Sequence, residues 1–244
     1  MKLKMNVVAQ IAAQAAELRL GAGLLAMMAI TLPLTMRAQD LSLDNFATGA
    51  VKMEGTTTVT STTQTGTGIF GGNRLIQITP NWFGTNEFLQ PVQVQVQPSS
   101  TSGVPSALLL TNGYSAFPRV DLFYGPAGTT TIPPLNLNMT LYQGFSLNFA
   151  GLSKELEFIM LVYDVNGTYA VVECGLASNA SVRAFTLNVP TANFSGSVEW
   201  SDIKTIIVSF LAGNIYGTPN LAITRFSATA NPAVGAVACG TPTT

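Results

Sequence analysis

The clearest structural signal in the chain is the stretch ELEFIMLVYDVNGTYAVVECGL, residues Glu155–Leu176. Two runs rich in β-branched and aromatic residues flank Asn166–Gly167, a pair that suits the positive φ angles of a type I′ turn. The sequence therefore predicts a β-hairpin. The first arm, Phe158–Tyr163, is apolar on both faces, which indicates a central strand.

Apolar and polar residues alternate along most of the chain after residue 40. Val92–Gln97 reads VQVQVQ, and the same period marks Leu135–Leu141, Phe145–Phe149 and Phe185–Val189. This alternation buries one face of a strand and leaves the other in water, as in antiparallel sheets. Clusters of Gly, Pro, Asn and Ser separate about eleven to thirteen such runs. The sequence thus predicts an all-β fold, an antiparallel two-sheet β-sandwich of jelly-roll type.

The composition excludes several classes of protein. The chain has 244 residues, of which 47% are hydrophobic and 9% charged, with a formal net charge of -1 and no histidine. This hydrophobic fraction excludes a disordered chain, and the low charge offers no clustered Lys and Arg for nucleic acid. Without histidine, neither a Ser-His-Asp triad nor a His-based zinc or haem site can form.

The N-terminus has the pattern of a secretory signal peptide. Lys2 and Lys4 precede an apolar run over residues 20–34, and cleavage is expected after Ala38. The run is shorter than the roughly 20 residues of a membrane-spanning helix. We therefore expect a protein that is secreted or held at the cell surface, with no membrane attachment after cleavage. Two alternatives stay open, namely an uncleaved membrane anchor and a true start at Met5.

These observations divide the chain into three predicted parts. They are a signal peptide at 1–38, a single β-sandwich domain at 39–230 and a flexible C-terminal tail at 231–244. In an oxidising compartment the two cysteines, Cys174 and Cys239, favour one disulfide that ties the tail to a central strand. The alternative is a buried free Cys174 with Cys239 in a disordered tail.

Four short motifs resemble a known group of proteins. They are LDNFATG (Leu43–Gly49), GIFGGNR (Gly68–Arg74), VDLFYG (Val120–Gly125) and NLAITRF (Asn220–Phe226). In this order they resemble exported bacterial β-sandwich proteins that often bear a PEP-CTERM sorting tail, although residues 231–244 do not resemble that tail. The domain of this group is similar to galactose-binding-like and carbohydrate-binding jelly rolls. The resemblance implies a β-sandwich and an exported protein.

Aromatic and amide side chains gather in the turn-rich segments. Sugars are held by aromatic platforms, because their C–H faces pack on rings while their hydroxyls need directed hydrogen-bond partners. We therefore predict a binding module without catalytic activity, with carbohydrate (a glycan or surface polymer) as the ligand class. The predicted ligand-contact residues are Trp82, Asn86, Asn112, Tyr114 and Tyr216.

The acidic residues do not form a recognisable catalytic or metal motif. A glycosidase needs two carboxyl groups that face each other across a cleft. Glu155 and Glu157 share one face of a strand end, and Glu199 and Asp202 flank a tryptophan, so neither pair matches that arrangement. We predict no catalytic residues and no cofactor, although a structural Ca²⁺ could be gathered from distant strands.

The stretch TTTVTSTTQTGTG, residues 56–68, supports a second hypothesis. An uncharged, Thr-rich strand at a sheet edge can pair with another chain. The alternative function is therefore a structural or adhesive component of an extracellular matrix or surface layer, with self-association through edge strands. A solvated edge strand of a monomer explains the same stretch.

Overall fold

The structure is a computed structural model, in which residues 38–244 group into one unit. None of its described helices is long and apolar enough to cross a membrane. The structure describes residues 39–55, 58–79, 92–100, 104–111, 119–126, 131–153, 155–176, 184–212, 220–231 and 237–239. The expected signal peptide therefore lies outside the described residues.

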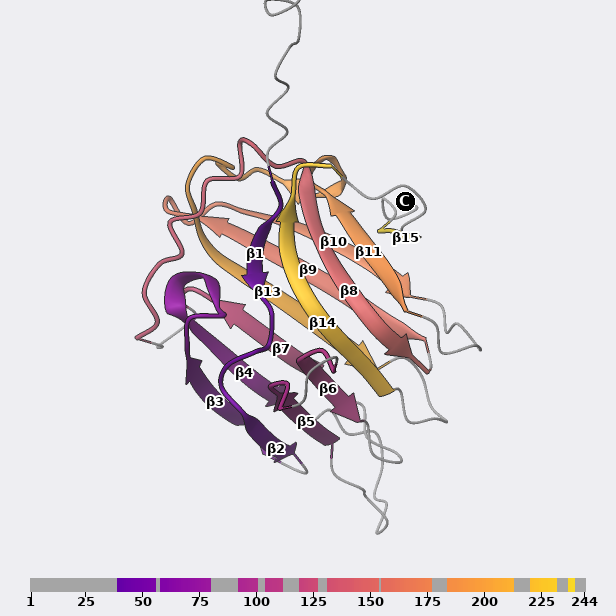
Figure 1. Cartoon of the computed structure of the whole chain (residues 1–244). Helices are drawn as coiled ribbons and strands as arrows, with labels where there is room; N and C mark the ends of the chain where they lie inside the picture. Colours follow the sequence, from indigo (N-terminus) through magenta and orange to yellow (C-terminus); the bar gives the residue numbers. More distant parts are fainter. Residues whose placement is uncertain are drawn as a thin grey trace, which may run out of the picture. The chain divides into compact units, whose positions relative to one another are not determined.

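Two sheets form a β-sandwich, which confirms the predicted fold class (Figure 1). The eight-stranded sheet has the order β15 (Val237–Ala238), β11 (Phe185–Pro190), β8 (Gly144–Leu152), β14 (Asn220–Thr229), β6 (Ala107–Thr111), β5 (Val92–Gln97), β2 (Val51–Gly55), and β1 (Leu41–Asp44) pairs with β14. The seven-stranded sheet has the order β12 (Ser195–Gly196), β10 (Tyr169–Leu176), β9 (Leu156–Asp164), β13 (Ile203–Ala212), β7 (Arg119–Tyr124), β4 (Asn73–Thr79), β3 (Thr60–Thr65). Two 3₁₀ turns complete the described elements, η1 (Phe70–Gly72) and η2 (Thr191–Asn193).

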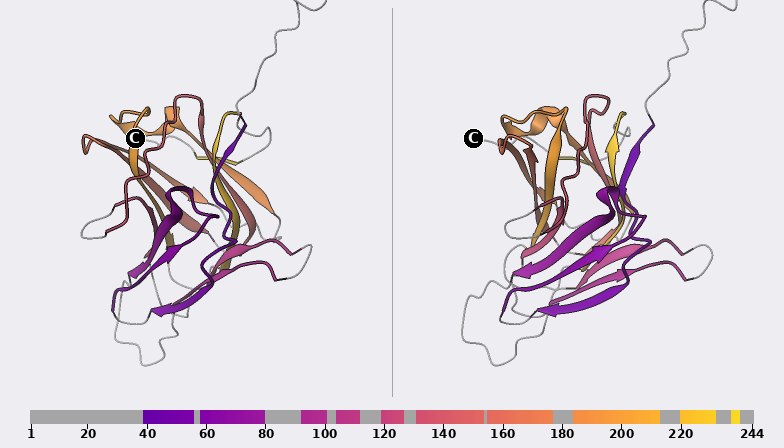
Figure 2. Two further views of the ribbon diagram at one scale, coloured as in Figure 1. Left: turned by 60° about the vertical axis from the view of Figure 1, so that its left-hand side comes forward. Right: turned by 90° about the vertical axis from the view of Figure 1, so that its left-hand side faces the viewer.

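The hydrophobic core fills the space between the two layers, which face each other in Figure 2. On β5 the three valines are buried while the alternating glutamines face outward, as the VQVQVQ pattern predicts. The arm Phe158–Tyr163 lies within β9, between β10 and β13, so its prediction as a central strand is confirmed. Its inward side chains are buried, and its outward apolar side chains are partly exposed.

The predicted hairpin exists, but its turn is not type I′. Tyr163 pairs with Tyr169, and the Asp164 and Thr168 backbones join across a three-residue loop. Only Gly167 in this loop has a positive φ, of 83°. Asp164 explains the difference, because its carboxylate accepts hydrogen bonds from the amides of Asn166 (2.9 Å) and Thr168 (3.0 Å). These bonds stabilise a longer loop than the two-residue turn.

Alternation over Leu135–Leu141 predicted burial on one face, but this segment is not a strand. Leu135, Leu137 and Met139 are buried, whereas Leu141 is 71% exposed. The segment pairs with the seven-stranded sheet only at isolated points and not along a continuous ladder. One such point is the β-bridge between Leu137 and Ile203. Asn136 has φ 51°, which interrupts the extended backbone that a ladder requires.

Three of the four sequence motifs meet in one buried cluster between the sheets. Asp44 on β1 accepts hydrogen bonds from Arg74 Nη1 (2.5 Å) and Tyr124 Oη (2.9 Å), and the Asp44 and Arg74 side chains have no exposed area. Arg74 also donates to Gln64 Oε1 (2.7 Å) and to the Thr48 carbonyl (2.8 Å). Burial raises the pKa of Tyr124 well above its ordinary value, so its hydroxyl remains a donor. These motifs therefore join the two sheets.

The predicted disulfide is present. Cys174 on β10 and Cys239 are bonded across 65 residues with a Cα–Cα distance of 5.4 Å. Cys239 follows β15, which runs parallel to β11, so the bond links the two sheets. Of the tail 231–244, the structure describes residues 231 and 237–239, and these last three are held by strand pairing and the disulfide.

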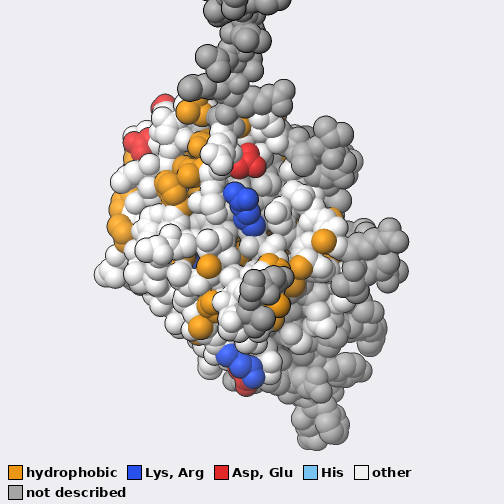
Figure 3. Space-filling view, viewed as in Figure 1, with side chains coloured by type: hydrophobic (Ala, Val, Ile, Leu, Met, Phe, Trp, Pro, Cys, Tyr) orange, Lys and Arg blue, Asp and Glu red, His pale blue; other side chains and the backbone are white. Residues whose placement is uncertain are grey.

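The surface over the eight-stranded sheet carries few charged groups. Figure 3 views this sheet from its outer side. Most of the described surface is white, the colour of the backbone and of side chains that are neither hydrophobic nor charged. Polar, uncharged side chains of Ser, Thr, Asn and Gln occupy these outward positions, for example Gln93 and Gln95 of β5. The low charge of the sequence is thus matched by a neutral, hydrophilic sheet face.

Candidate functional site

The five predicted ligand-contact residues lie outside the described residues, in three segments that each link one sheet to the other. The flanking strand ends of these segments meet at one end of the sandwich, since Thr79 pairs with Arg119 and Thr111 pairs with Asn220. The segments are therefore attached at the same end of the domain. Their own placement stays a prediction for Trp82 and Asn86 (segment 80–91), Asn112 and Tyr114 (segment 112–118) and Tyr216 (segment 213–219).

A row of apolar side chains crosses the outer face of the seven-stranded sheet. Strand register places Phe123 beside Ile207, Ile207 beside Leu161, and Leu161 beside Val171. All four are partly exposed. With neighbouring strands about 4.8 Å apart, the row extends roughly 14 Å over β7, β13, β9 and β10.

Two tyrosines extend this row toward the β9–β10 turn. Tyr163 pairs with Tyr169 across the hairpin, their ring centroids lie 5.6 Å apart, and Tyr169 is 53% exposed. On the opposite side of the row, the partly exposed side chain of Arg119 donates hydrogen bonds to Asp121 and Ser209, which are both buried. The outer face thus has an apolar, aromatic strip with a basic side chain along one side.

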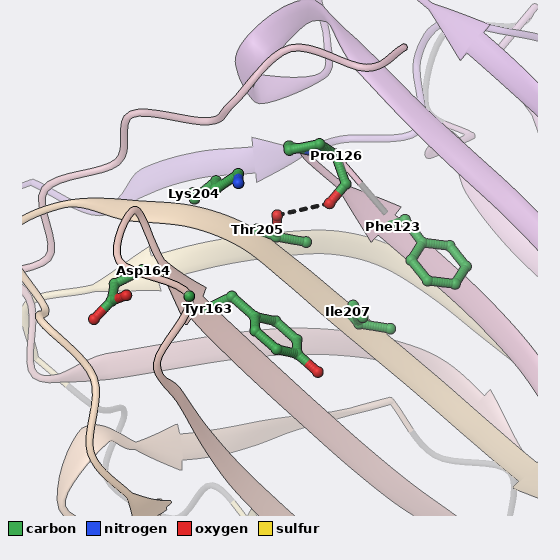
Figure 4. Close-up of a pocket in the computed structure, with 8 residues that line it drawn as sticks. Phe123, Pro126, Tyr163, Asp164, Lys204, Thr205 and Ile207 are labelled. Atoms are coloured by element: carbon green, nitrogen blue, oxygen red, sulfur yellow. Dashed lines mark hydrogen bonds between the residues drawn. The ribbon is translucent and has the colours of Figure 1, made fainter. Parts of the chain in front are cut away.

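A pocket of about 340 Å³ opens at the tyrosine end of this strip (Figure 4). In Figure 4 the rings of Tyr163 and Phe123 lie on either side of Ile207. Lys204 and Thr205 of β13 also line the pocket, and Thr205 Oγ1 donates a hydrogen bond of 2.9 Å to the Pro126 carbonyl. The volume lies within the range of about 300–1,000 Å³ typical of small-ligand sites.

Asp164 fixes the wall of this pocket rather than offering a free carboxylate. Besides the turn amides, it accepts hydrogen bonds from Thr168 Oγ1 and from the Glu199 amide (3.0 Å). The bond with Thr168 is the largest cause of a lowered pKa for Asp164, followed by the bond from Glu199. Because its oxygens already accept four protein donors, Asp164 acts as a structural residue that holds the hairpin turn against the segment after β12.

Among the described residues, the acidic pairs considered from the sequence do not match a glycosidase arrangement: Glu155 precedes β9, and Glu157 lies on β9 two residues later. Glu157 and Glu173 lie on adjacent strands and share a hydrogen bond, which is the largest cause of the raised pKa of Glu157. Glycoside hydrolysis requires two carboxyl groups that face each other across a cleft, whereas Glu157 and Glu173 share one face of the sheet. Glu199 and Asp202, the second pair considered, belong to one turn in which the Asp202 amide donates to the Glu199 carbonyl (3.2 Å).

Three of the aspartates that could bind calcium, Asp44, Asp121 and Asp164, already accept protein donors. Asp44 is paired with Arg74, and Asp121 accepts from Arg119 Nε (2.7 Å) and from Ser209. Within the part of the chain that the structure describes, no group of three or more His, Cys, Asp or Glu is arranged to hold a metal ion.

The chain matches no family model and no curated protein. It is similar to solved structures at low identity. One is the family 11 carbohydrate-binding module of a cellulosomal cellulase of Clostridium thermocellum, with 12% identity over 81% of this chain and 98% of that chain, and a TM-score of 0.36. Another is a family 11 carbohydrate-binding module from Clostridium thermocellum in complex with a β-1,3-1,4-mixed-linked tetrasaccharide, with 14% identity over 80% of this chain and 98% of that chain, and a TM-score of 0.36.

An agarase is also similar, with 12% identity over 64% of this chain and a TM-score of 0.38. The similar region covers only 25% of the agarase chain. These likenesses are too weak to assign an activity or a ligand to this protein.

Proposed function

We propose that this protein is a secreted, non-catalytic carbohydrate-binding module that binds a glycan on the outer face of its seven-stranded sheet. The observation that carries the proposal is the set of partly exposed rings, Phe123, Tyr163 and Tyr169, beside a pocket with polar groups. Rings of this kind pack against sugar C–H groups, and polar neighbours bind the hydroxyls.

The geometry favours an extended chain rather than a single sugar. The apolar strip runs across four strands, from Phe123 on β7 to Val171 on β10. A linear glycan laid along it would contact the apolar row, the two tyrosines and the pocket beside them. The disulfide between Cys174 and Cys239 supports secretion, because such bonds persist in oxidising compartments.

The experiment is a glycan-array screen of the disulfide-bonded protein, followed by titration of the best oligosaccharide against variants. Tyr163→Ala is expected to weaken binding about ten-fold or more, because it removes a ring face from the pocket. Tyr163→Phe keeps the ring and is expected to keep most of the affinity. Leu141→Ala, at a side chain that is 71% exposed and outside the strip, is the matched surface control.

The same titration distinguishes this surface from the loop residues predicted by the sequence. Trp82→Ala is expected to abolish glycan retention if the segments at the end of the sandwich form the site. A loss with Trp82→Ala and none with Tyr163→Ala would contradict the sheet-face proposal and favour the loop cluster. Repeating the array with calcium and with a chelator tests the calcium hypothesis, since a structural ion would make retention calcium-dependent.

One observation keeps the assembly hypothesis as a second candidate. β3 is the edge strand of the seven-stranded sheet and reads TSTTQT, with no charged residue or proline to block pairing. Two other edge strands are less open to pairing. β12, at the other edge of the same sheet, has only two residues, and β2, at an edge of the eight-stranded sheet, carries the charged Lys52 and Glu54. Large oligomers in sedimentation, reduced by Thr62→Lys, together with an empty glycan array would favour assembly.

A further inference from the structure

A second pocket, of about 120 Å³, lies on the outer face of the eight-stranded sheet, on the opposite side of the sandwich. Its floor comes from two cross-strand rows of polar side chains. Asn188 pairs with Ser146 and Ser146 with Ser227, while Thr186 pairs with Asn148 and Asn148 with Arg225. None of its lining residues is apolar. This pocket therefore suits a ligand that binds by hydrogen bonds, unlike the aromatic strip.

A β-bulge turns Arg225 toward this pocket. Ile223 pairs with Phe149 and Arg225 with Asn148, so Thr224 is an extra residue on β14. Ile223 and Phe226 are both buried, and simple alternation from Ile223 would direct Arg225 into the core. The bulge places Arg225 on the outer face instead, where it is exposed. Bulges that re-aim one side chain are frequent beside functional sites.

The charge of Arg225 has no ion-pair partner among the described residues, in contrast to Arg74 and Arg119. In Figure 3 a basic and an acidic area lie close together near the middle of this sheet face. The acidic residue of the pocket is Asp40, which accepts hydrogen bonds from Thr229 Oγ1 (2.9 Å) and the Ala230 amide (3.2 Å). Arg225 is thus the cation of the pocket that can donate to a bound anionic group.

Ser227 adds an unused hydrogen-bonding group at the floor. It is 1% exposed, and its hydroxyl has no hydrogen-bond partner among the described residues. A buried polar group without a partner costs free energy, which a ligand hydroxyl in the pocket would recover. The hydroxyl of Ser227 and the guanidinium of Arg225, two positions apart on β14, therefore call for a ligand with both hydroxyl and anionic groups.

We propose that this pocket is a second saccharide site, selective for a sugar residue that carries a carboxylate. Arg225 binds the carboxylate, and the hydroxyl and amide groups of Ser227, Ser146 and Asn148 bind the ring hydroxyls. The site goes beyond the proposed glycan surface because it lies on the other sheet and uses no aromatic ring. The chain would then hold a neutral stretch of glycan on one face and an acidic sugar on the other.

The test is an NMR titration of the full disulfide-bonded protein with D-galacturonate and, in parallel, D-galactose. The two probes differ at C6, which carries a carboxylate in one and a hydroxyl in the other. Galacturonate is expected to shift the backbone amides of 146–148 and 225–229 and to bind about ten-fold or more tightly than galactose. Arg225→Gln is expected to remove that difference, and Arg225→Lys to keep part of it.

Two controls keep the result interpretable. Arg119→Gln, on the opposite sheet, should leave galacturonate binding unchanged, and so should Tyr163→Ala if the two sites are independent. Equal affinity for both sugars, insensitivity to Arg225→Gln, or loss with Tyr163→Ala would overturn the proposal. Equal shifts with acetate at the same concentrations would also overturn it, because they would reveal a site for small anions alone.

Discussion

Replacing Arg74 by methionine is the most informative perturbation of the buried cluster that links the two sheets. Arg74 and Asp44 have no exposed side-chain area, and their ion pair has an N–O distance of 2.5 Å. The substitution keeps the apolar stem in place but leaves the Asp44 carboxylate with the Tyr124 hydroxyl and the Phe46 amide as its remaining described donors. It also leaves Gln64 Oε1 and the Thr48 carbonyl without the guanidinium.

The expected loss of unfolding free energy follows from this geometry. Removing one partner of a buried ion pair costs about 3–5 kcal/mol, because the remaining charge is desolvated and unpaired. A domain of this size has about 5–15 kcal/mol of total stability, so the loss is a large fraction of it. With a urea m-value of about 2 kcal/mol/M, the unfolding midpoint should fall by roughly 2 M.

The measurement is urea unfolding at neutral pH with the disulfide intact, compared with Arg225→Met as a control of the same residue type. Arg225 is exposed and has no ion pair among the described residues, so its substitution should change stability by less than about 0.5 kcal/mol. The double variant Asp44→Leu with Arg74→Met should recover part of the loss, because it leaves no isolated charge. A loss below about 1 kcal/mol for Arg74→Met, or a further loss in the double variant, would refute the reasoning.

Two further predictions concern the crosslink and the hairpin turn. Replacing Cys174 and Cys239 together by alanine opens a loop of 65 residues and should lower stability by up to about 4 kcal/mol, as measured by chemical unfolding; unchanged stability would contradict the bond. The pKa of Asp164 is lowered from 3.8 by its hydrogen bonds, so its stabilising effect is present above that value and is lost as the pH falls through the lower, folded-state pKa. Asp164→Asn should flatten this acidic part of a thermal-unfolding profile, and an identical profile in both proteins would rule out the assigned role.

The candidate sites depend on contacts between distant residues, and these contacts could not be predicted from the sequence. The apolar character of Phe158–Tyr163 is visible in the sequence and predicts its central position in the sheet. It does not reveal that Tyr163 lies beside a pocket with Phe123, which is 40 residues earlier in the chain. Likewise, Arg225 belongs to the motif NLAITRF, yet only the bulge on β14 shows that Arg225 faces outward.

What the sequence determines by itself is local. A two-residue period indicates which face of each strand is buried, and Asn166–Gly167 marks a turn, so most strands, the presence of the hairpin and the core could be predicted from neighbouring residues. The turn type and the irregular backbone of Leu135–Leu141 could not. The tertiary structure alone decided which strands pair and in what register. That pairing brings Asp44, Arg74 and Tyr124 into one ion-paired cluster across 80 residues of chain, and it aligns Phe123, Ile207 and Leu161 in one row. Such neighbours depend on which distant strands pair, whereas the local pattern fixes only which face of each strand is buried.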